Sequence, residues 1–283
     1  MRYLFLVGLL MPFVVCAETS LWRVSDGNAE LFIGGTVHVL SQNDYPLPPE
    51  FERAYRKADV LVLETDLAAM AAPETQLKLM QRLRYLEGET LQDNLDAETY
   101  GALKAYCSGI GLPIESLHGF KPPLVAITLL MTELQRWGLA DAGVDDFFNR
   151  KAKAEGKALI GLESLEQQLN TIERMGQGHE NELILSTLKE LRELPVIMRS
   201  MKTAWRQGDM ETLEQIGITP LHMEYPALYQ DLLVNRNKAW LPDIAAMLTT
   251  PERELILVGA LHLAGREGVL DQLRRRGYTV ERY

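Results

Sequence analysis

Two short turns of the same design carry the residues best suited to chemistry. Gly35-Thr-Val-His38 follows the apolar run Leu31–Ile33, and Gly259-Ala-Leu-His262 follows the apolar run Leu255–Val258. A glycine at the end of a strand lets the backbone turn tightly and leaves room for a ligand. The histidine three residues later can then point back over the edge of a sheet. We therefore interpret the two turns as two halves of one active site.

Carboxylates occupy the corresponding places after two other apolar runs. Glu64 directly follows Val60–Leu63, and Glu163 comes shortly after Lys157–Ile160. Ligands of open α/β sheets bind beyond the carboxyl ends of the strands, where residues distant in sequence meet. We therefore expect both carboxylates to lie near the two histidines.

This set of side chains is compatible with three kinds of function. Two imidazoles and one or two carboxylates can hold a divalent ion such as Zn, Mn, Fe or Co, which would turn a bound water into a nucleophile. The same side chains can act without a metal, with a carboxylate orienting an imidazole that serves as general base. They can also bind haem or a peptide without turnover. The residue types alone leave these alternatives open.

Four further residues are candidates for supporting roles. Arg236 and Asn237 lie within an expected helix over Tyr229–Leu248, where the permanent charge of arginine can hold a substrate carboxylate or orient one of the glutamates. Asp66 lies two residues beyond Glu64 and can support Glu64 from the side that faces away from the ligand. Lys121 precedes two prolines. Without a role in function, Arg236 would form a surface salt bridge and Lys121 would be solvated.

The elements that must position these residues alternate between strand and helix. Ser25-Asp-Gly-Asn-Ala29 joins the first two strands, and its Asp-Gly pair predicts a hairpin. Continuous apolar runs further on favour strands that are buried on both faces of a parallel sheet. We expect strands at 21–24, 31–33, 60–63, 157–160, 254–258 and 278–280, and helices at 49–57, 98–108, 122–137, 145–155, 229–248 and 266–276.

This alternation predicts an α/β fold with a mainly parallel central sheet and an N-terminal hairpin. The surplus of helix predicts large insertions, at about 73–156 and 164–250, that cap the C-terminal ends of the strands. The chain has no internal repeat and no Pro/Ser-rich linker. Residues 18–283 are therefore expected to form a single domain.

Composition restricts the class of partner. The chain has 283 residues, of which 47% are hydrophobic and 24% charged, so a packed core is expected. The formal net charge of −10 and the lack of aromatic residues among the Lys and Arg clusters argue against nucleic acid. We expect a small peptide or protein substrate. The oligomeric state is not predicted.

The first 17 residues have the pattern of a signal peptide. Arg2 gives a positive start, residues 3–15 are apolar but too short to anchor the chain in a bilayer, and cleavage is expected after Ala17. A lipoprotein signal at Cys16 is the weaker alternative, because Val15 precedes it. The mature chain would be periplasmic or secreted, without a membrane span. Its remaining cysteine, Cys107, is expected to be a small buried hydrophobe.

The ordered motifs of the chain resemble the TraB/GumN family, which is related to the Tiki proteins and more distantly to erythromycin-esterase-like and ChaN-like proteins. The resemblance covers essentially the whole mature chain. Its markers are Leu21-Trp22, Gly35–His38, Leu47-Pro48, Leu63–Asp66, Lys121-Pro122, Gly143–Asp145, Gly161–Glu163 with Gln167, Trp205 with Gly208-Asp209, Arg236-Asn237, and Val258–Leu263 with Gly265 and Gly268.

The resemblance implies an α/β fold with a helical cap, in which His38, Glu64 and His262 correspond to the signature residues of the family. Tiki proteins are described as metal-dependent proteases that favour manganese or cobalt, and pheromone-related bacterial members are linked to limiting peptide signals. Esterase-like relatives use His and Glu without a clear need for metal, and ChaN-like relatives bind haem. Family membership alone therefore does not fix the chemistry.

The leading hypothesis from the sequence is a periplasmic, metal-dependent hydrolase that acts on peptide bonds. In it, His38 and His262 ligate one divalent ion, and Glu64 is the third ligand or the general base. Glu163 and Arg236 would support the substrate or the ligands. A metal-free esterase-type hydrolase and a haem- or peptide-binding protein are the alternatives.

Overall fold

The computed structural model describes residues 19–138 and 141–283. The expected signal peptide, residues 1–17, lies outside this range. Within it, no helix combines the length and the apolar character needed to cross a membrane.

The described strands form a six-stranded sheet and a separate two-stranded sheet. The order in the large sheet is β6-β4-β7-β2-β1-β8. Three of the contacts, β6 with β4, β4 with β7 and β7 with β2, are parallel, whereas β1 pairs antiparallel with β2 and β8. The strands are β1 (Leu21–Ser25), β2 (Glu30–Thr36), β3 (Val39–Leu40), β4 (Val60–Leu63), β5 (Asp141–Ala142), β6 (Ala158–Gly161), β7 (Glu254–Gly259) and β8 (Thr279–Arg282).

Alternating side chains of the large sheet pack into two separate layers of core. In β7, Leu255 and Leu257 join the cluster that packs against α1 (Pro49–Lys57) and α6 (Val144–Glu155). Ile256 and Val258 face the opposite way, into a cluster with α12 (Asn235–Met247) and α13 (Val269–Arg275). Successive side chains of a strand point to opposite faces, so a fully apolar strand requires helices on both sides. The sheet is therefore the middle of three layers.

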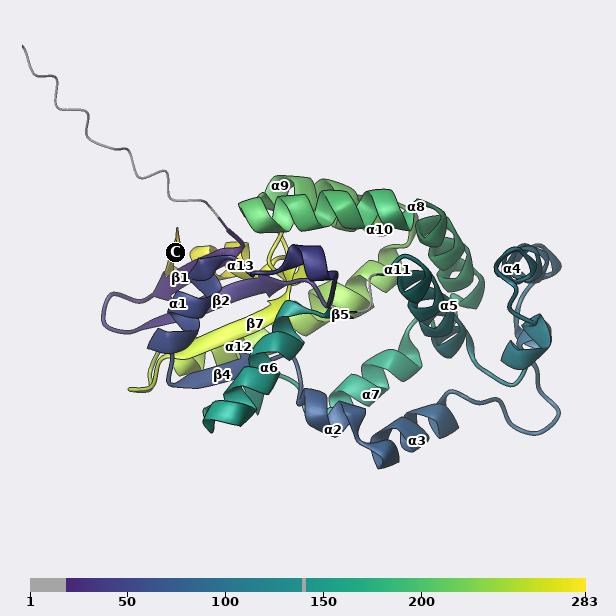
Figure 1. Ribbon diagram of the computed structural model, residues 1–283, viewed down its shortest axis with the longest axis horizontal. Coiled ribbons are helices and arrows are strands. Elements are labelled where there is room, and N and C mark those ends of the chain that lie inside the picture. Colours follow the sequence, from purple (N-terminus) through teal and green to yellow (C-terminus); the bar gives the residue numbers. More distant parts are fainter. Residues whose placement is uncertain (1–18, 139–140) are drawn as a thin grey trace, which may run out of the picture.

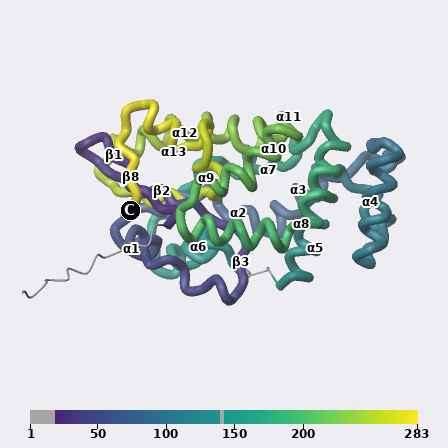
Figure 2. The backbone as a smooth tube through the Cα atoms, turned by 90° about the horizontal axis from the view of Figure 1, so that it is seen from above, coloured from purple at the N-terminus to yellow at the C-terminus, as the bar shows by residue number. Residues whose placement is uncertain are grey.

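The remaining helices extend the molecule away from the sheet. The long helix α8 (Glu180–Gln207) runs from the sheet towards α4 (Ala97–Ile110) and α5 (Pro122–Arg136) at the far end, as Figures 1 and 2 show. The other α-helices are α2 (Leu67–Ala71), α3 (Pro73–Arg82), α7 (Leu165–Arg174), α9 (Met210–Leu213), α10 (Thr219–Glu224) and α11 (Pro226–Tyr229). Single turns of 3-10 helix are η1 (Gln42–Asp44), η2 (Leu91–Asn94), η3 (Ile114–Leu117) and η6 (Ala260–His262), and η4 (Glu214–Ile218) and η5 (Gln230–Val234) are π-helical.

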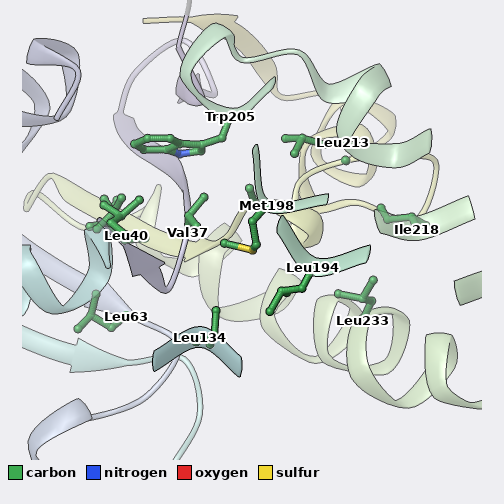
Figure 3. Close-up of a cluster of buried hydrophobic side chains, with 14 of the residues drawn as sticks. Val37, Leu40, Leu63, Leu134, Leu194, Met198, Trp205, Leu213, Ile218 and Leu233 are labelled. Carbon is green, nitrogen blue, oxygen red and sulfur yellow. The ribbon is translucent and has the colours of Figure 1, made fainter. Parts of the chain in front are cut away.

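Helix α8 also fixes the first of the two histidine turns. Its Trp205 is fully buried and donates a hydrogen bond from Nε1 to the carbonyl oxygen of Gly35 at 2.6 Å. Val37 and Leu40, on either side of His38, lie in the same buried cluster as Trp205 and Met198 (Figure 3). The helical part of the molecule thus holds one side of the strand-end region in place.

The α/β prediction is confirmed, including the N-terminal hairpin and the mainly parallel sheet. Cys107 is also buried in a helix, as expected. The strand expected to be buried at 157–160 is instead an edge strand, β6, with mostly exposed side chains. The sequence pattern of this strand resembles that of an inner strand because its residues are apolar. Whether the sheet and both helical segments form one domain stays a prediction.

Candidate active site

The four strand-end motifs converge on one place. Oε1 of Glu64, at the end of β4, lies 4.0 Å from Nε2 of His38 and 4.0 Å from Nε2 of His262. His38 follows β2 and His262 follows β7, and both strands belong to the same parallel part of the sheet as β4. The two imidazoles therefore approach one carboxylate oxygen from two sides.

The glycines of the two turns make this approach possible. A Cβ atom on Gly259 would lie 3.2 Å from Nε2 of His38 and 3.4 Å from Oε1 of Glu64. A Cβ atom on Gly35 would lie 3.1 Å from Cα of Ala260. Neither glycine has a positive φ angle. Each glycine therefore serves to leave room for the opposite turn, and not to provide a special backbone conformation.

His38 is oriented by Asp145, at the first turn of α6. The Nδ1 atom of His38 lies 3.1 Å from Oδ2 of Asp145. The short β3–β5 pairing brings the two segments together, and a Cβ atom on Gly143 would lie 2.3 Å from the carbonyl oxygen of His38. With Asp145 on Nδ1, Nε2 of His38 is the ring atom that faces Glu64.

His262 has a corresponding partner in Asn237. Its Nδ1 atom lies 2.7 Å from Oδ1 of Asn237, whose Nδ2 donates to the carbonyl oxygen of Glu267 at 2.9 Å. Because Oδ1 accepts, Nδ1 of His262 carries the proton and Nε2 is left with its lone pair. The ring also packs against Trp240, with 4.5 Å between the ring centroids. His262 is therefore held in one orientation and one tautomer.

Arg236 joins the two glutamates and His262 into one network. Its Nη2 donates to Oε2 of Glu64 at 2.6 Å, its Nε donates to Oε1 of Glu163 at 2.6 Å, and its Nη1 lies 3.2 Å from Nε2 of His262. Trp240 donates from Nε1 to the same Glu163 oxygen at 3.0 Å, and its ring lies 4.9 Å from the guanidinium carbon. The guanidinium group therefore supplies the charge that balances two nearly buried carboxylates.

The environment of Glu64 keeps it ionised. Burial acts to raise the pKa of its carboxyl group. The interactions with His262, Arg236 and His38, together with the Gly259 N–H that donates to Oε1 at 2.7 Å, outweigh this effect and lower the pKa to about 2. Glu64 is consequently a carboxylate throughout the physiological pH range.

The two histidines are pushed to opposite charge states. Desolvation acts to lower the pKa of His38, but the hydrogen bond and charge of Asp145 and the charge of Glu64 outweigh it and raise the pKa to about 9. Burial lowers the pKa of His262 to about 3, with Arg236 contributing and Glu64 opposing. The side chain of His38 is 59% exposed, whereas that of His262 is 5% exposed. At neutral pH, His38 is an exposed acid and His262 a buried neutral ring.

A pocket of about 290 Å³ opens beside this cluster. His38, Glu64 and Asp145 form part of its wall, and Gln168 of α7 reaches it from another side. His262 and Arg236 are not among its lining residues. A bound molecule would therefore meet His38 and Glu64 directly, while His262 and Arg236 act on it through Glu64.

The side chains in this arrangement do not form a ready metal site. In the part of the chain that the structure describes, no group of three or more His, Cys, Asp or Glu side chains is placed to hold an ion. Arg236 Nη1 lies against Nε2 of His262, the atom that a metal would need. A divalent ion between His38, Glu64 and His262 would require the guanidinium group to move.

Six of the eight predicted site residues lie together, and two lie elsewhere. His38, Glu64, Glu163, Arg236, Asn237 and His262 form the cluster described above. Asp66 instead accepts hydrogen bonds from the amides of Ala68 and Ala69 and caps α2. Lys121 precedes α5, lies 3.8 Å from Glu173 and lines a different pocket.

Sequence reasoning gave no site role to Asp145, Trp240 or Gln168. Asp145 stood among the family markers, in Gly143-Val-Asp145, and its place beside a glycine at the start of a helix was the available signal. Trp240 lies four residues after Arg236, on the same face of α12. Gln168 carries no such signal, because only its neighbour Gln167 is among the family markers.

Comparison with known proteins supports the resemblance noted from the motifs. A model of the TraB/PrgY/gumN family matches residues 20–282. The chain is 28% identical over 251 residues to the uncharacterized protein YbaP of Escherichia coli (strain K12), which covers 88% of this chain and 89% of YbaP, and it is equally similar to YbaP of Shigella flexneri. No solved structure matches the chain. Since the family match includes the whole sheet and every side chain of the cluster, the chain belongs to the TraB/PrgY/gumN family.

Proposed function

We propose that the protein is a hydrolase whose reaction takes place between His38 and Glu64, with peptides as the substrate class. The observation that carries the proposal is the geometry of the pair: the imidazole of His38 and the carboxylate of Glu64 lie 4.0 Å apart on the wall of one pocket. Their raised and lowered pKa values, which follow from the opposite charges around them, leave a proton donor beside a proton acceptor at neutral pH. The choice of peptides rests on the resemblance to the Tiki proteins.

Each residue of the cluster has a distinct role in this proposal. Glu64 orients a water molecule and takes its proton as the water oxygen attacks the carbonyl carbon. His38 gives its proton to the leaving amine when the carbon–nitrogen bond breaks, and Asp145 holds the ring for this transfer. His262 and Arg236 position Glu64 from the side that faces away from the pocket.

The rate of hydrolysis should depend on pH through His38. Because the acid must carry its proton, kcat/KM should be constant through neutral pH and fall by about tenfold per pH unit above the pKa of His38, about 9. Asp145→Asn keeps an acceptor for the ring but removes the charge that raises this pKa. It should therefore move the alkaline fall to lower pH.

Asp146→Asn is the matched control for this pH profile. Asp146 is the next residue of α6, but it pairs on the surface with Arg150 at 3.2 Å. Its loss should leave the profile unchanged. An alkaline limb that stays in place in Asp145→Asn would show that His38 is not the acid.

A metal-dependent form of the same hydrolase is the second candidate. It is favoured by the hydrogen bonds that the Nδ1 atoms of His38 and His262 donate to Asp145 and Asn237, which leave both Nε2 atoms facing Glu64. Such partners behind a histidine are typical of metal ligands. The residues that would hold the ion are His38, His262 and Glu64, and the ion would activate a water molecule.

The function can be tested with a mixture of unmodified peptides and the purified mature protein, with mass spectrometry to detect new termini. Acid–base hydrolysis should continue after treatment with a chelator. Loss of cleavage with the chelator and its return with Mn²⁺ would instead favour the metal-dependent form. A complete lack of cleavage with and without added Mn²⁺, Co²⁺ or Zn²⁺ would contradict the proposal, and a visible absorption band after incubation with haem would then favour the binding protein.

We also propose that the protein acts outside the cytoplasm, because residues 1–17 have the pattern of a signal peptide. The exported protein would then begin at Glu18. An intact Met1 or a lipid on Cys16 in that protein would contradict this cleavage.

A further inference from the structure

The pocket beside His38 and Glu64 has a second, apolar wall. Leu63 and Leu257 lie at its base, where both side chains are almost fully buried, and Leu67 and Met70 reach it from α2. Both leucines at the base belong to strands β4 and β7, so this part of the pocket is fixed by the sheet. Binding pockets commonly combine an apolar wall with a few placed polar groups. The apolar wall therefore has the position of a binding surface for part of the substrate.

Helix α2 presents only two long side chains, and both of them line the pocket. Its sequence is Leu-Ala-Ala-Met-Ala, and residues three apart lie on the same face of a helix. The capping carboxylate of Asp66 holds the start of the helix, and Gln76 donates from Nε2 to the carbonyl oxygen of Met70 at 2.6 Å near its end. Leu67 and Met70 are thus directed into the pocket by a short segment that is anchored at both ends.

Gln168 adds a polar group to the same pocket. Its Oε1 faces Nη2 of Arg236 at 3.4 Å, a long contact that nevertheless orients the amide. With Oε1 on this side, the NH₂ group is left as a donor, and no side chain or backbone atom of the described residues accepts from it. The amide can therefore donate a hydrogen bond to a carbonyl oxygen of a molecule in the pocket.

We propose that this pocket is a subsite for one aliphatic or aromatic side chain next to the bond that is cleaved, and that Met70 and Leu67 set the size it accepts. Gln168 holds the neighbouring backbone carbonyl of the substrate. This inference rests on the proposed function and gives its substrate class: peptides with an apolar residue at the cleaved position.

Size and charge both support this occupant. A volume of about 290 Å³ lies just below the range for small-molecule sites, about 300–1,000 Å³, so the pocket suits a single side chain better than a larger ligand. Glu64 already pairs with Arg236, and Oδ2 of Asp145 with His38, whereas Oδ1 of Asp145 has no hydrogen-bond partner among the described residues. An acidic side chain would face both carboxylates, and a basic one would lose water against the apolar wall.

Two changes at Met70 test the size of the subsite. Met70→Ala should enlarge it, so that the ratio of kcat/KM for a peptide with Phe to one with Leu rises by about tenfold, which is the scale on which small changes of apolar fit act. Met70→Trp should fill it and lower kcat/KM for both peptides by at least about tenfold, while a peptide with Ala at this position is affected less.

Met80→Ala is the matched control. Met80 lies on the next helix, α3, is 47% exposed and does not line the pocket. Its substitution should leave the ratio between the Phe and Leu peptides unchanged. An unchanged ratio in both Met70 variants, or the same change in Met80→Ala, would overturn the subsite.

Gln168→Met tests the polar part of the subsite. Methionine keeps a similar length but removes the donor, so kcat/KM should fall by about fivefold to tenfold for every peptide, without a change in the Phe to Leu ratio. The fall should appear in KM if the amide holds the substrate in the ground state. Wild-type kcat/KM in this variant would remove Gln168 from the proposal.

A binding measurement separates the failure of the subsite from the failure of the proposed hydrolysis. The probes are the N-acetyl amides of alanine, leucine and phenylalanine, with binding to the wild-type protein and to the Met70 and Met80 variants followed by NMR. Size-dependent binding that changes only with Met70, in a protein that cleaves no peptide, would keep the subsite and reject the hydrolase. Cleavage of peptides regardless of apolar side chain, with no response to Met70, would keep the hydrolase and reject the subsite.

Discussion

Replacing Glu64 with glutamine should lower kcat/KM by at least about 10²–10³-fold, while the protein keeps its fold. A glutamine cannot take a proton from water, and it also removes the negative charge that faces His38. The loss of a general base lowers reaction rates by a factor of this size. The glutamine oxygen can still accept the Gly259 N–H, and Arg236 keeps its bonds to Glu163, but the glutamine NH₂ group then faces Nη2 of Arg236. The variant should therefore lose some stability but remain folded, so that the fall in rate can be measured in a folded protein.

The control for Glu64→Gln is Asp66→Asn, which makes the same change of chemistry two residues along the chain. Asparagine is as good a cap as aspartate, so α2 should remain in place. The rates of Asp66→Asn should stay close to wild type, and circular dichroism and thermal unfolding should show both variants folded. Activity in Glu64→Gln within a few-fold of wild type would mean that the reaction does not use this carboxylate.

Replacing Arg236 with methionine should destabilise the protein by about 3–5 kcal/mol. The guanidinium group is 13% exposed and is the partner of Glu64 and Glu163, whose side chains are 13% and 7% exposed. Removing one member of a buried ion pair leaves the other charge unpaired, and here two carboxylates remain. Urea unfolding at neutral pH measures the change in the free energy of unfolding.

The pH dependence of this loss identifies its cause. In the wild type, the lowered pKa of Glu64, about 2, contributes stability that is present above the unfolded pKa, about 4.5, and is lost as pH falls towards 2. Arg236 supplies part of this contribution, beside His262, His38 and the Gly259 N–H, so the stability difference between wild type and variant should shrink below pH 4.5. Arg275→Met removes an exposed pair with Asp271, 2.7 Å apart, and should cost less than about 1 kcal/mol at any pH. Equal costs for the two arginines would contradict the network.

The meeting of the strand-end motifs could be predicted because it depends on short-range patterns. Apolar runs identify inner strands of a parallel sheet, and the residues that follow them must emerge at one edge. His38, Glu64, Glu163 and His262 all obey this rule. The same rule wrongly predicted that β6 is buried, because an apolar strand at the edge of a sheet has the same local pattern as one in the middle.

The residues that support the motifs depend on longer-range geometry. Asp145 reaches His38 through the pairing of β3 with β5, two strands of two residues each, which no periodicity can reveal. Arg236 points into the site from a helix that continues directly from the π-helical turn η5. A π turn shifts the register of the residues that follow it, so the face of each residue cannot be obtained from a regular helical repeat. Whether Asp66 enters the site or caps α2 likewise depends on the turn after β4, which the sequence pattern does not predict.

The place of β7 in the sheet has a consequence for the order in which the molecule can be completed. This strand comes near the end of the chain, yet it lies between β4 and β2. Until β7 is in place, β2 and β4 have no common neighbour, and their inner edges remain unpaired. A chain truncated before β7 therefore contains the large sheet only as two separate strand pairs, β1–β2 and β4–β6, and only half of the histidines of the site. Assembly of the sheet and of the cluster of His38, Glu64 and His262 should therefore be a single late event with long-range contacts, which requires nearly the whole chain.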